Sequence, residues 1–251
     1  MTSASPLLEL RGVRKSFGSE LVLRDVDLVV PEHTVTVLIG ASGSGKSTLL
    51  RCINQLELID DGLVLFEGVD LADPRHDRDE IRQRIGIVFQ AFNLFPHMSV
   101  LDNVTLAMRR VRKVPRAQAE ATALELLERY SLADKAAQYP DRISGGQQQR
   151  VAIVRALAVA PKLMLFDEVT SALDPVLVNE VLAAVRDLRE DGMTMVIATH
   201  EMGFATQVAD ELCFLSDGVI VERGAPDHVI SAPEDPRTQE FLRRVHEAGR
   251  L

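Results

Sequence analysis

The chain has 251 residues, 46% of them apolar, so it can bury a sizeable core, and we expect one domain with an inserted lobe. Its 28 Lys and Arg residues against 37 Asp and Glu residues give a net charge of −9, which lends no support to a nucleic acid or an anionic membrane surface as partner. The cysteines, Cys52 and Cys213, fit no metal-ligand spacing, and we expect buried cytosolic thiols rather than a disulfide. Met1 to Leu10 lacks the pattern of a signal peptide, and no apolar run is long enough to span a membrane, so we expect a soluble protein.

Two strands are expected at the start of the chain, Leu7 to Phe17 and Leu21 to Val30. We expect these two strands to pair as an antiparallel flap beside the strand that follows. Phe17, next to a glycine between the two strands, could stack on an adenine base or could be an ordinary core residue. At this point both alternatives stay open.

A phosphate-binding loop follows. The buried strand Val35 to Ile39 leads into Gly40-Ala41-Ser42-Gly43-Ser44-Gly45-Lys46-Ser47-Thr48, and a helix is expected over Lys46 to Gln55. Glycines let backbone N–H groups approach an anion, and the first helical turn adds unpaired donors. Lys46 then supplies charge to the β and γ phosphates, and the Ser47 hydroxyl can ligate Mg²⁺.

A helical lobe is predicted in the middle of the chain. Leu63 to Phe66 and Ile85 to Phe89 indicate short strands, the second ending at Gln90, and an aromatic loop follows. The next segments, Val100 to Arg110 and Arg116 to Tyr130, show helical periodicity. For the second helix the pattern predicts a buried face made by Ala117, Ala121, Leu124 and Leu127.

A second helix start comes at Ile143-Ser144-Gly145-Gly146-Gln147, before an Ala- and Val-rich helix to Ala160. Ser144 and the two glycines favour an N-cap and an anion site. An isolated Ser-Gly-Gly, however, is more often a cap and nothing more.

Acidic and imidazole side chains follow two further predicted strands. Leu163 to Phe166 ends in Asp167 and Glu168, which suit a Mg²⁺ shell and the polarisation of an attacking water. Asp174 is a natural N-cap for a helix that begins at Pro175 and runs to about Arg189. His200 follows the strand Met193 to Ala198 and can reach a γ phosphate.

The remaining segments predict a hairpin that turns at Asp217-Gly218 and a surface helix over Asp235 to Arg250.

Together these motifs resemble the nucleotide-binding subunit of ATP-binding cassette transporters, over nearly the whole chain and in the expected order. The resemblance rests on Phe17, the loop from Gly40, Gln90, the signature Ile143 to Gln147, Asp167-Glu168, Ser171 to Asp174, and His200. Two mild departures are Ile143, where Leu is commoner, and Val169, where many relatives have Pro.

The resemblance implies an α/β P-loop ATPase fold with a RecA-like mixed sheet, an antiparallel β flap and an inserted α-helical subdomain. Residues 1–90 and 161–230 would form the nucleotide-binding core, 91–160 the helical signature subdomain and 231–251 a C-terminal helical extension. It also implies roles for individual residues. ATP would contact Phe17, Gly40, Ser42, Gly43, Ser44, Gly45, Lys46, Ser47, Thr48, Ser144, Gly145, Gly146, Gln147 and Asp174. Ser47, Gln90 and Asp167 would hold Mg²⁺, and Glu168, His200, Lys46 and Gln90 would be catalytic.

In this family the signature of one subunit closes over the nucleotide on the P-loop of the other. The resemblance therefore implies a homodimer with two ATP molecules at its interface, membrane permease subunits as partners, and indirectly a solute-binding protein. It places the subunit in the cytoplasm, on the inner face of the membrane. Phe92-Asn93-Leu94-Phe95-Pro96-His97 and Thr199 to Ala205 resemble ATPases of bacterial polar amino acid importers.

Three alternatives stay open. A related importer subgroup for compatible solutes such as ectoine shares much of this pattern. A non-transport cassette ATPase of DNA repair, chromosome structure or translation usually has two fused cassettes or a long coiled coil, which this chain lacks. A P-loop kinase would have no use for Ser144 to Gln147.

Overall fold

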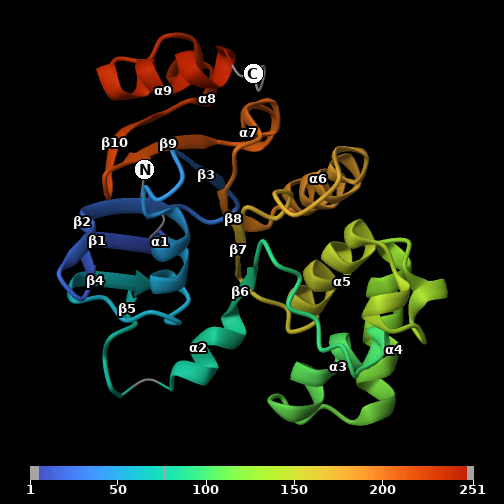
Figure 1. Cartoon of the computed structure of the whole chain (residues 1–251). Helices are drawn as coiled ribbons and strands as arrows, with labels where there is room; N and C mark the ends of the chain where they lie inside the picture. The colour runs from blue at the N-terminus through green and yellow to red at the C-terminus, as the bar shows by residue number, and fades with distance from the viewer. Residues whose placement is uncertain (1–5, 76, 248–251) are drawn as a thin grey trace.

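The computed structural model describes residues 6–75 and 77–247, and its centre is a mixed six-stranded sheet (Figure 1). The strand order is β10-β9-β3-β8-β7-β6. All neighbours from β9 to β6 pair in parallel, and β10 pairs with β9 antiparallel. These strands are β3 (Val35–Ile39), β6 (Ile85–Val88), β7 (Leu163–Asp167), β8 (Thr194–Ala198), β9 (Glu211–Ser216) and β10 (Val219–Gly224).

A second, four-stranded antiparallel sheet forms the expected flap, in the order β2-β1-β4-β5. Its strands are β1 (Leu8–Phe17), β2 (Glu20–Val30), β4 (Asp61–Phe66) and β5 (Val69–Asp70). Helix α1 (Lys46–Ile53) lies between the two sheets, because its Leu49, Leu50 and Ile53 share one buried cluster with residues of both. The flap is thus fixed beside the loop that precedes α1.

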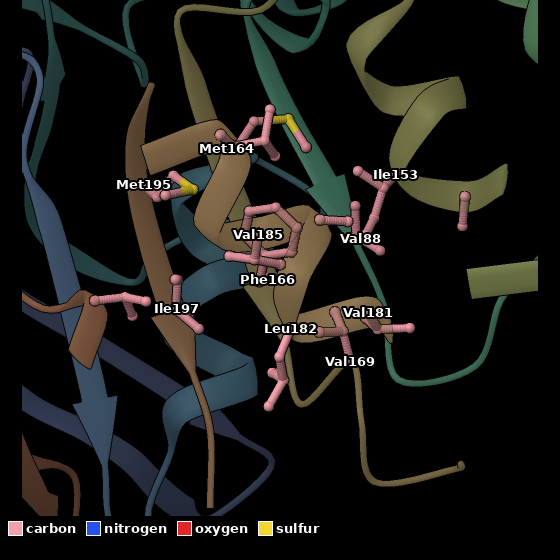
Figure 2. Packing of buried hydrophobic residues seen from close by; sticks show 14 of the residues in the cluster. Val88, Ile153, Met164, Phe166, Val169, Val181, Leu182, Val185, Met195 and Ile197 are labelled. Atoms are coloured by element: carbon pink, nitrogen blue, oxygen red, sulfur yellow. The ribbon is translucent and has the colours of Figure 1, made fainter. Parts of the chain in front are cut away.

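The central strands bury both faces, which explains why their sequences are continuous apolar runs rather than alternating ones. In β7, Leu163 and Leu165 face the cluster around α1, whereas Met164 and Phe166 face the opposite cluster. Figure 2 shows this opposite cluster, where Val181, Leu182 and Val185 of α6 (Pro175–Glu190) pack over Phe166. Strand β7 is therefore covered by apolar residues on both faces.

Three helices form a lobe beside β6, as Figure 1 shows: α3 (Val100–Arg110), α4 (Arg116–Arg129) and α5 (Gly145–Leu157). The predicted buried face of α4 is wrong except for Leu127. Ala117, Ala121 and Leu124 are exposed, and the buried residues are Ala119, Ala123 and Leu127. Both sets have helical spacing, and the packing of α4 against α3 and α5 selects the second.

The remaining elements are short helices and turns, the C-terminal hairpin and the last helix. The short helices are α2 (Arg78–Arg84), α7 (Met202–Val208) and α8 (Pro226–Ser231), with single 3₁₀ turns at Ala133–Lys135 and Pro140–Arg142. The predicted hairpin is confirmed, because Asp217 and Gly218 have φ of 50° and 78° between β9 and β10. The C-terminal helix is α9 (Pro236–Glu247); it begins one residue after the predicted start at Asp235, and residues 248–250 of the prediction lie outside the described residues. Cys52 and Cys213 are buried free thiols, as expected. Among the described residues, no helix is both long and apolar enough to cross a membrane.

Candidate active site

The candidate residues of the core meet at the carboxyl edge of the parallel sheet. Strand β3 ends just before Gly40, β7 ends at Asp167, and β8 ends two residues before His200. The strands are level there, because Ala198 pairs with Leu38 on one side and with Asp167 on the other. Side chains separated by more than a hundred residues therefore share one edge, where parallel sheets bind their ligands.

The P-loop has the backbone shape that its glycines predict. A Cβ at Gly40 would lie 2.2 Å from the Leu215 carbonyl oxygen, so no larger residue fits there. Gly43 has a φ of 79°, and a Cβ added at this position would have no atom within 4 Å. The first turn of α1 presents the amides of Lys46, Ser47 and Thr48, which have no intrahelical partners. The loop is thus an open cradle of N–H donors, suited to phosphate oxygens.

Ser44 adds a polar group without a partner. The residue is only 7% exposed, and among the described residues its Oγ has no hydrogen-bond partner. An unpaired buried hydroxyl is unfavourable by about 1 to 3 kcal/mol. A phosphate oxygen in the cradle would satisfy it, so the loop fits a nucleotide.

Lys46 is a buried cation that lies near the carboxylates of Glu168 and Asp167. Its Nζ donates to the carbonyl oxygens of Gly40 at 2.8 Å and Ala41 at 3.1 Å, and it lies 3.5 Å from Glu168 Oε1. Burial lowers the pKa of Lys46, and the nearby Glu168 carboxylate opposes this effect. A bound phosphate would stabilise the ammonium further.

Glu168 also contacts His200. The His200 Nε2 lies 2.8 Å from Glu168 Oε1, and this hydrogen bond is the main reason why the pKa of Glu168 is lowered. Glu168 has a φ of 48°, a left-handed conformation that is rare for a glutamate, and its amide donates to the Ala198 carbonyl at 2.9 Å. The neighbouring strand therefore fixes an unusual backbone that turns this carboxylate towards Lys46 and His200.

Ser47 and Asp167 are the predicted metal ligands that the structure brings together. The Ser47 Oγ donates to Asp167 Oδ1 at 2.6 Å. Burial raises the pKa of Asp167, while the Ser47 hydrogen bond lowers it. A hydroxyl and a buried carboxylate side by side beneath the phosphate cradle are the hard oxygen donors that Mg²⁺ prefers, so these residues fit the ion.

The other two candidate residues of the core, Gln90 and Phe17, are exposed at the rim of the site. Gln90 is exposed, two residues beyond the end of β6. Phe17 is 46% exposed at the end of β1, so the alternative of a core phenylalanine is wrong. Both stay candidates by position.

The signature lies apart from this cluster within one chain. Ser144 and Gln147 form a reciprocal cap of α5: Ser144 Oγ accepts from the Gln147 amide at 3.2 Å, and Gln147 Oε1 accepts from the Ser144 amide at 2.9 Å. Gly145 and Gly146 begin the helix that this cap starts. Figure 1 shows α5 and α1 on opposite sides of β6 and β7. Asp174 directly precedes α6, as predicted, and its carbonyl accepts from the Leu177 amide at 2.8 Å.

Two residues that sequence reasoning missed join the signature helix to the loop of Gln90. Gln149 is fully buried, and its Nε2 donates to the Phe89 carbonyl at 3.1 Å. Arg155 donates to the Asn93 carbonyl at 2.6 Å and to that of Phe92 at 3.3 Å. The sequence signal for Gln149 was weak. It is a polar residue on the apolar face of its helix, four residues before Ile153, which indicates a buried amide that needs a partner.

Comparison with known proteins gives a consistent result. The profile of the ABC transporter family matches residues 23–171. The chain is 52% identical over 247 residues to the arginine transport ATP-binding protein ArgV of Corynebacterium glutamicum, with 94% of this chain and 97% of that protein covered. It is 53% identical over 239 residues to the glutamine transport ATP-binding protein GlnQ of Escherichia coli, with 95% and 100% covered.

Solved structures agree with the fold. A dimeric ATP-binding cassette, MJ0796, in a post-hydrolysis state with ADP and Pi has a TM-score of 0.77 and 35% identity, covering 87% of this chain and 98% of that one. The cbiO1 subunit of a cbiONQ ABC transporter from Clostridium perfringens has a TM-score of 0.82 and 26% identity, with 97% and 96% covered.

Proposed function

The chain belongs to the ABC transporter family and is an ATPase of that family, and from this premise we propose that it powers the import of a polar amino acid. The observation that carries the proposed chemistry is the contact of Glu168 with both Lys46 and His200 at the edge of the parallel sheet. The names of the relatives, transporters of arginine, glutamate and glutamine, support the solute class.

Each residue of the site has a role in this proposal. Glu168, with its lowered pKa, is ionised at neutral pH and takes the proton of the attacking water or orients it. Lys46 and His200 hold the γ phosphate. Ser47 and Asp167, with Gln90, hold Mg²⁺, which when bound neutralises charge on the phosphate oxygens. The amides of the P-loop bind the phosphates, and Phe17 stacks on the adenine.

The proposed working unit is a head-to-tail dimer. Ser144, Gly145, Gly146 and Gln147 start α5 on the far side of β6 and β7 from the P-loop, so one chain does not bring them to its own cradle. We place them, with Asp174, against the nucleotide of a second copy. Two helix N-termini then converge on one triphosphate, which stabilises its charge.

A mixing experiment tests the dimer. Lys46→Ala damages the P-loop and Ser144→Arg damages the signature, so each variant alone should lose ATPase activity by at least about a hundredfold. Mixed dimers contain one composite site with an intact P-loop and an intact signature. Mixing should therefore restore activity to roughly a quarter of the wild-type rate, assuming random pairing and one active site per heterodimer. Mixtures that stay inactive, although mixed dimers form, would refute the shared site.

The proposed membrane partner docks on a cavity of about 600 Å³ between the core and the helical lobe. Its apolar lining includes Ile87, Phe95, Leu106 and Val159, and Arg82, Arg110 and Arg155 also face it. Because Phe95 is 40% exposed, an apolar segment of a permease subunit can bury it. We propose further that the subunit works on the inner face of the membrane and that a solute-binding protein supplies the substrate from outside.

The solute is tested by reconstitution with the permease and the binding protein. ATPase activity should rise when the binding protein carries glutamine, glutamate or arginine. Stimulation by ectoine alone would assign a compatible-solute importer instead. Nucleic-acid binding at physiological salt, without a membrane protein encoded beside the gene, would favour the non-transport alternative.

A further inference from the structure

Lys15 lies against the aromatic ring at the end of the flap strand. Its Nζ is 5.0 Å from the centroid of the Phe17 ring, within the range of a cation–π contact. The Lys15 side chain is only 12% exposed, whereas Phe17 is 46% exposed. A mostly buried lysine side chain therefore contacts a phenylalanine that is half exposed to solvent.

Asp60 fixes the position of this ammonium. Asp60 Oδ1 lies 3.4 Å from Lys15 Nζ, and Asp60 Oδ2 accepts a hydrogen bond from the Ser16 amide at 2.6 Å. The Asp60 amide in turn donates to the Arg14 carbonyl at 2.8 Å. Asp60 is thus bound to the β1 backbone on both sides of Lys15, through its carboxylate at Ser16 and through its amide at Arg14, and this places the carboxylate beside the Lys15 ammonium.

We propose that Lys15 is a positioning residue for the nucleotide base: its ammonium holds the Phe17 ring in the orientation that stacks on adenine. The inference rests on the proposed function, in which adenine stacks on Phe17. A ring that is already held loses less rotamer freedom when the base binds. The cation also offsets the negative face of the ring, which reduces the repulsion between two stacked π systems.

This role differs from a structural one in what it changes. A lysine that only supported the flap would affect all ligands of the P-loop equally, because the flap lies beside that loop. A lysine that orients the ring affects only ligands that carry a base. The ratio of the dissociation constants of ADP and pyrophosphate separates the two roles, since pyrophosphate has the phosphates without the base.

The test is calorimetric titration of the full chain with ADP and with pyrophosphate, each with Mg²⁺. For Lys15→Met we expect the Kd of ADP to rise about three- to tenfold, the range of a partly desolvated cation–π contact. The Kd of pyrophosphate should not change. Lys15→Arg, which keeps a cation over the ring, should restore most of the affinity. Lys162→Met is the matched control, because Lys162 pairs with Glu67 at a distant surface.

Phe17→Leu separates failure of this inference from failure of the proposed base contact. If Phe17→Leu raises the Kd of ADP but Lys15→Met does not, the positioning role is wrong and the adenine contact stands. The positioning role is also wrong if Lys15→Met raises the Kd of ADP and the Kd of pyrophosphate by the same factor. If Phe17→Leu leaves ADP unchanged, the base does not stack there and both proposals fall. In the double variant, losses that do not add would support a single coupled contact.

Discussion

Glu168 Oε1 lies 2.8 Å from His200 Nε2, although the two residues follow different strands of the sheet. Strands β7 and β8 are parallel neighbours, so their carboxyl ends place both side chains at one edge. Lys46 Nζ approaches the same oxygen at 3.5 Å from the helix after β3. One carboxylate oxygen therefore connects three segments of the chain at the proposed site of hydrolysis.

Glu168→Gln should keep ATP binding and lower the rate of phosphate release by about 10² to 10⁴ fold, the usual effect of losing a general base. It should also trap an ATP-bound dimer, measurable by size-exclusion chromatography with ATP and Mg²⁺. Glu201→Gln is the matched control, because Glu201 is exposed one residue beyond His200. A Glu168→Gln variant that hydrolyses ATP normally would overturn the role assigned to Glu168.

Asp167→Asn should make the nucleotide-free protein more stable and remove the stabilisation that Mg²⁺ adds to bound ATP. Burial raises the pKa of Asp167 above its ordinary value of 3.8, so the ionised carboxylate destabilises the folded state. We expect a rise in Tm of roughly 2 to 4 °C at pH 7, the shift that about 1 kcal/mol gives in a chain of this size.

The difference in stability between wild type and Asp167→Asn should depend on pH, and the direction of this dependence is defined. Below pH 3.8 Asp167 is protonated in both the folded and unfolded states, and wild type and variant should differ least. As the pH rises through the raised folded pKa, wild type should lose stability relative to Asp167→Asn, until the difference levels off. Differential scanning calorimetry without nucleotide measures it, and a difference that shrank with rising pH would contradict the buried charge.

Gln149→Leu should loosen the loop that carries Gln90. The substitution removes the hydrogen bond to the Phe89 carbonyl and leaves that carbonyl without its side-chain donor. Amide hydrogen exchange in residues 89–95 should accelerate roughly 5- to 30-fold, which corresponds to one or two kcal/mol. Gln148→Leu is the control, since Gln148 donates instead to Ile143 beside its own helix. Equal exchange in the two variants would show that Gln149 does not hold the loop.

Phe95→Asp should uncouple the subunit from its membrane partner without affecting its own chemistry. A charge at this half-exposed ring would oppose burial in an apolar interface. In a reconstituted transporter, ATPase stimulation by the loaded binding protein should fall at least tenfold, the effect typical of a buried aromatic anchor. The ATPase activity of the isolated subunit should stay. Leu124→Asp on α4 is the control, because Leu124 is similarly exposed but does not line the cavity.

Patterns with a local physical cause were predicted correctly from sequence. The P-loop, the cap at Ser144, the turn at Asp217-Gly218 and the start of α6 at Pro175 each depend on a few adjacent residues. The mostly apolar runs of β3, β7 and β8 were equally clear, because strands covered on both faces favour apolar residues. The division into core, signature subdomain and C-terminal extension, and the role of each site residue, stay predictions.

Tertiary structure alone decided the relations between distant segments. In α4, Ala119 and Ala123 are buried with Leu127, rather than the predicted Ala117, Ala121 and Leu124, because α3 and α5 pack on that side. Gln149 reaches Phe89 only because α5 lies against β6. The left-handed backbone of Glu168 is set by its hydrogen bond to β8, which no local pattern encodes. The sequence thus determined the chemical groups and their elements, and the order of the parallel strands decided which groups meet.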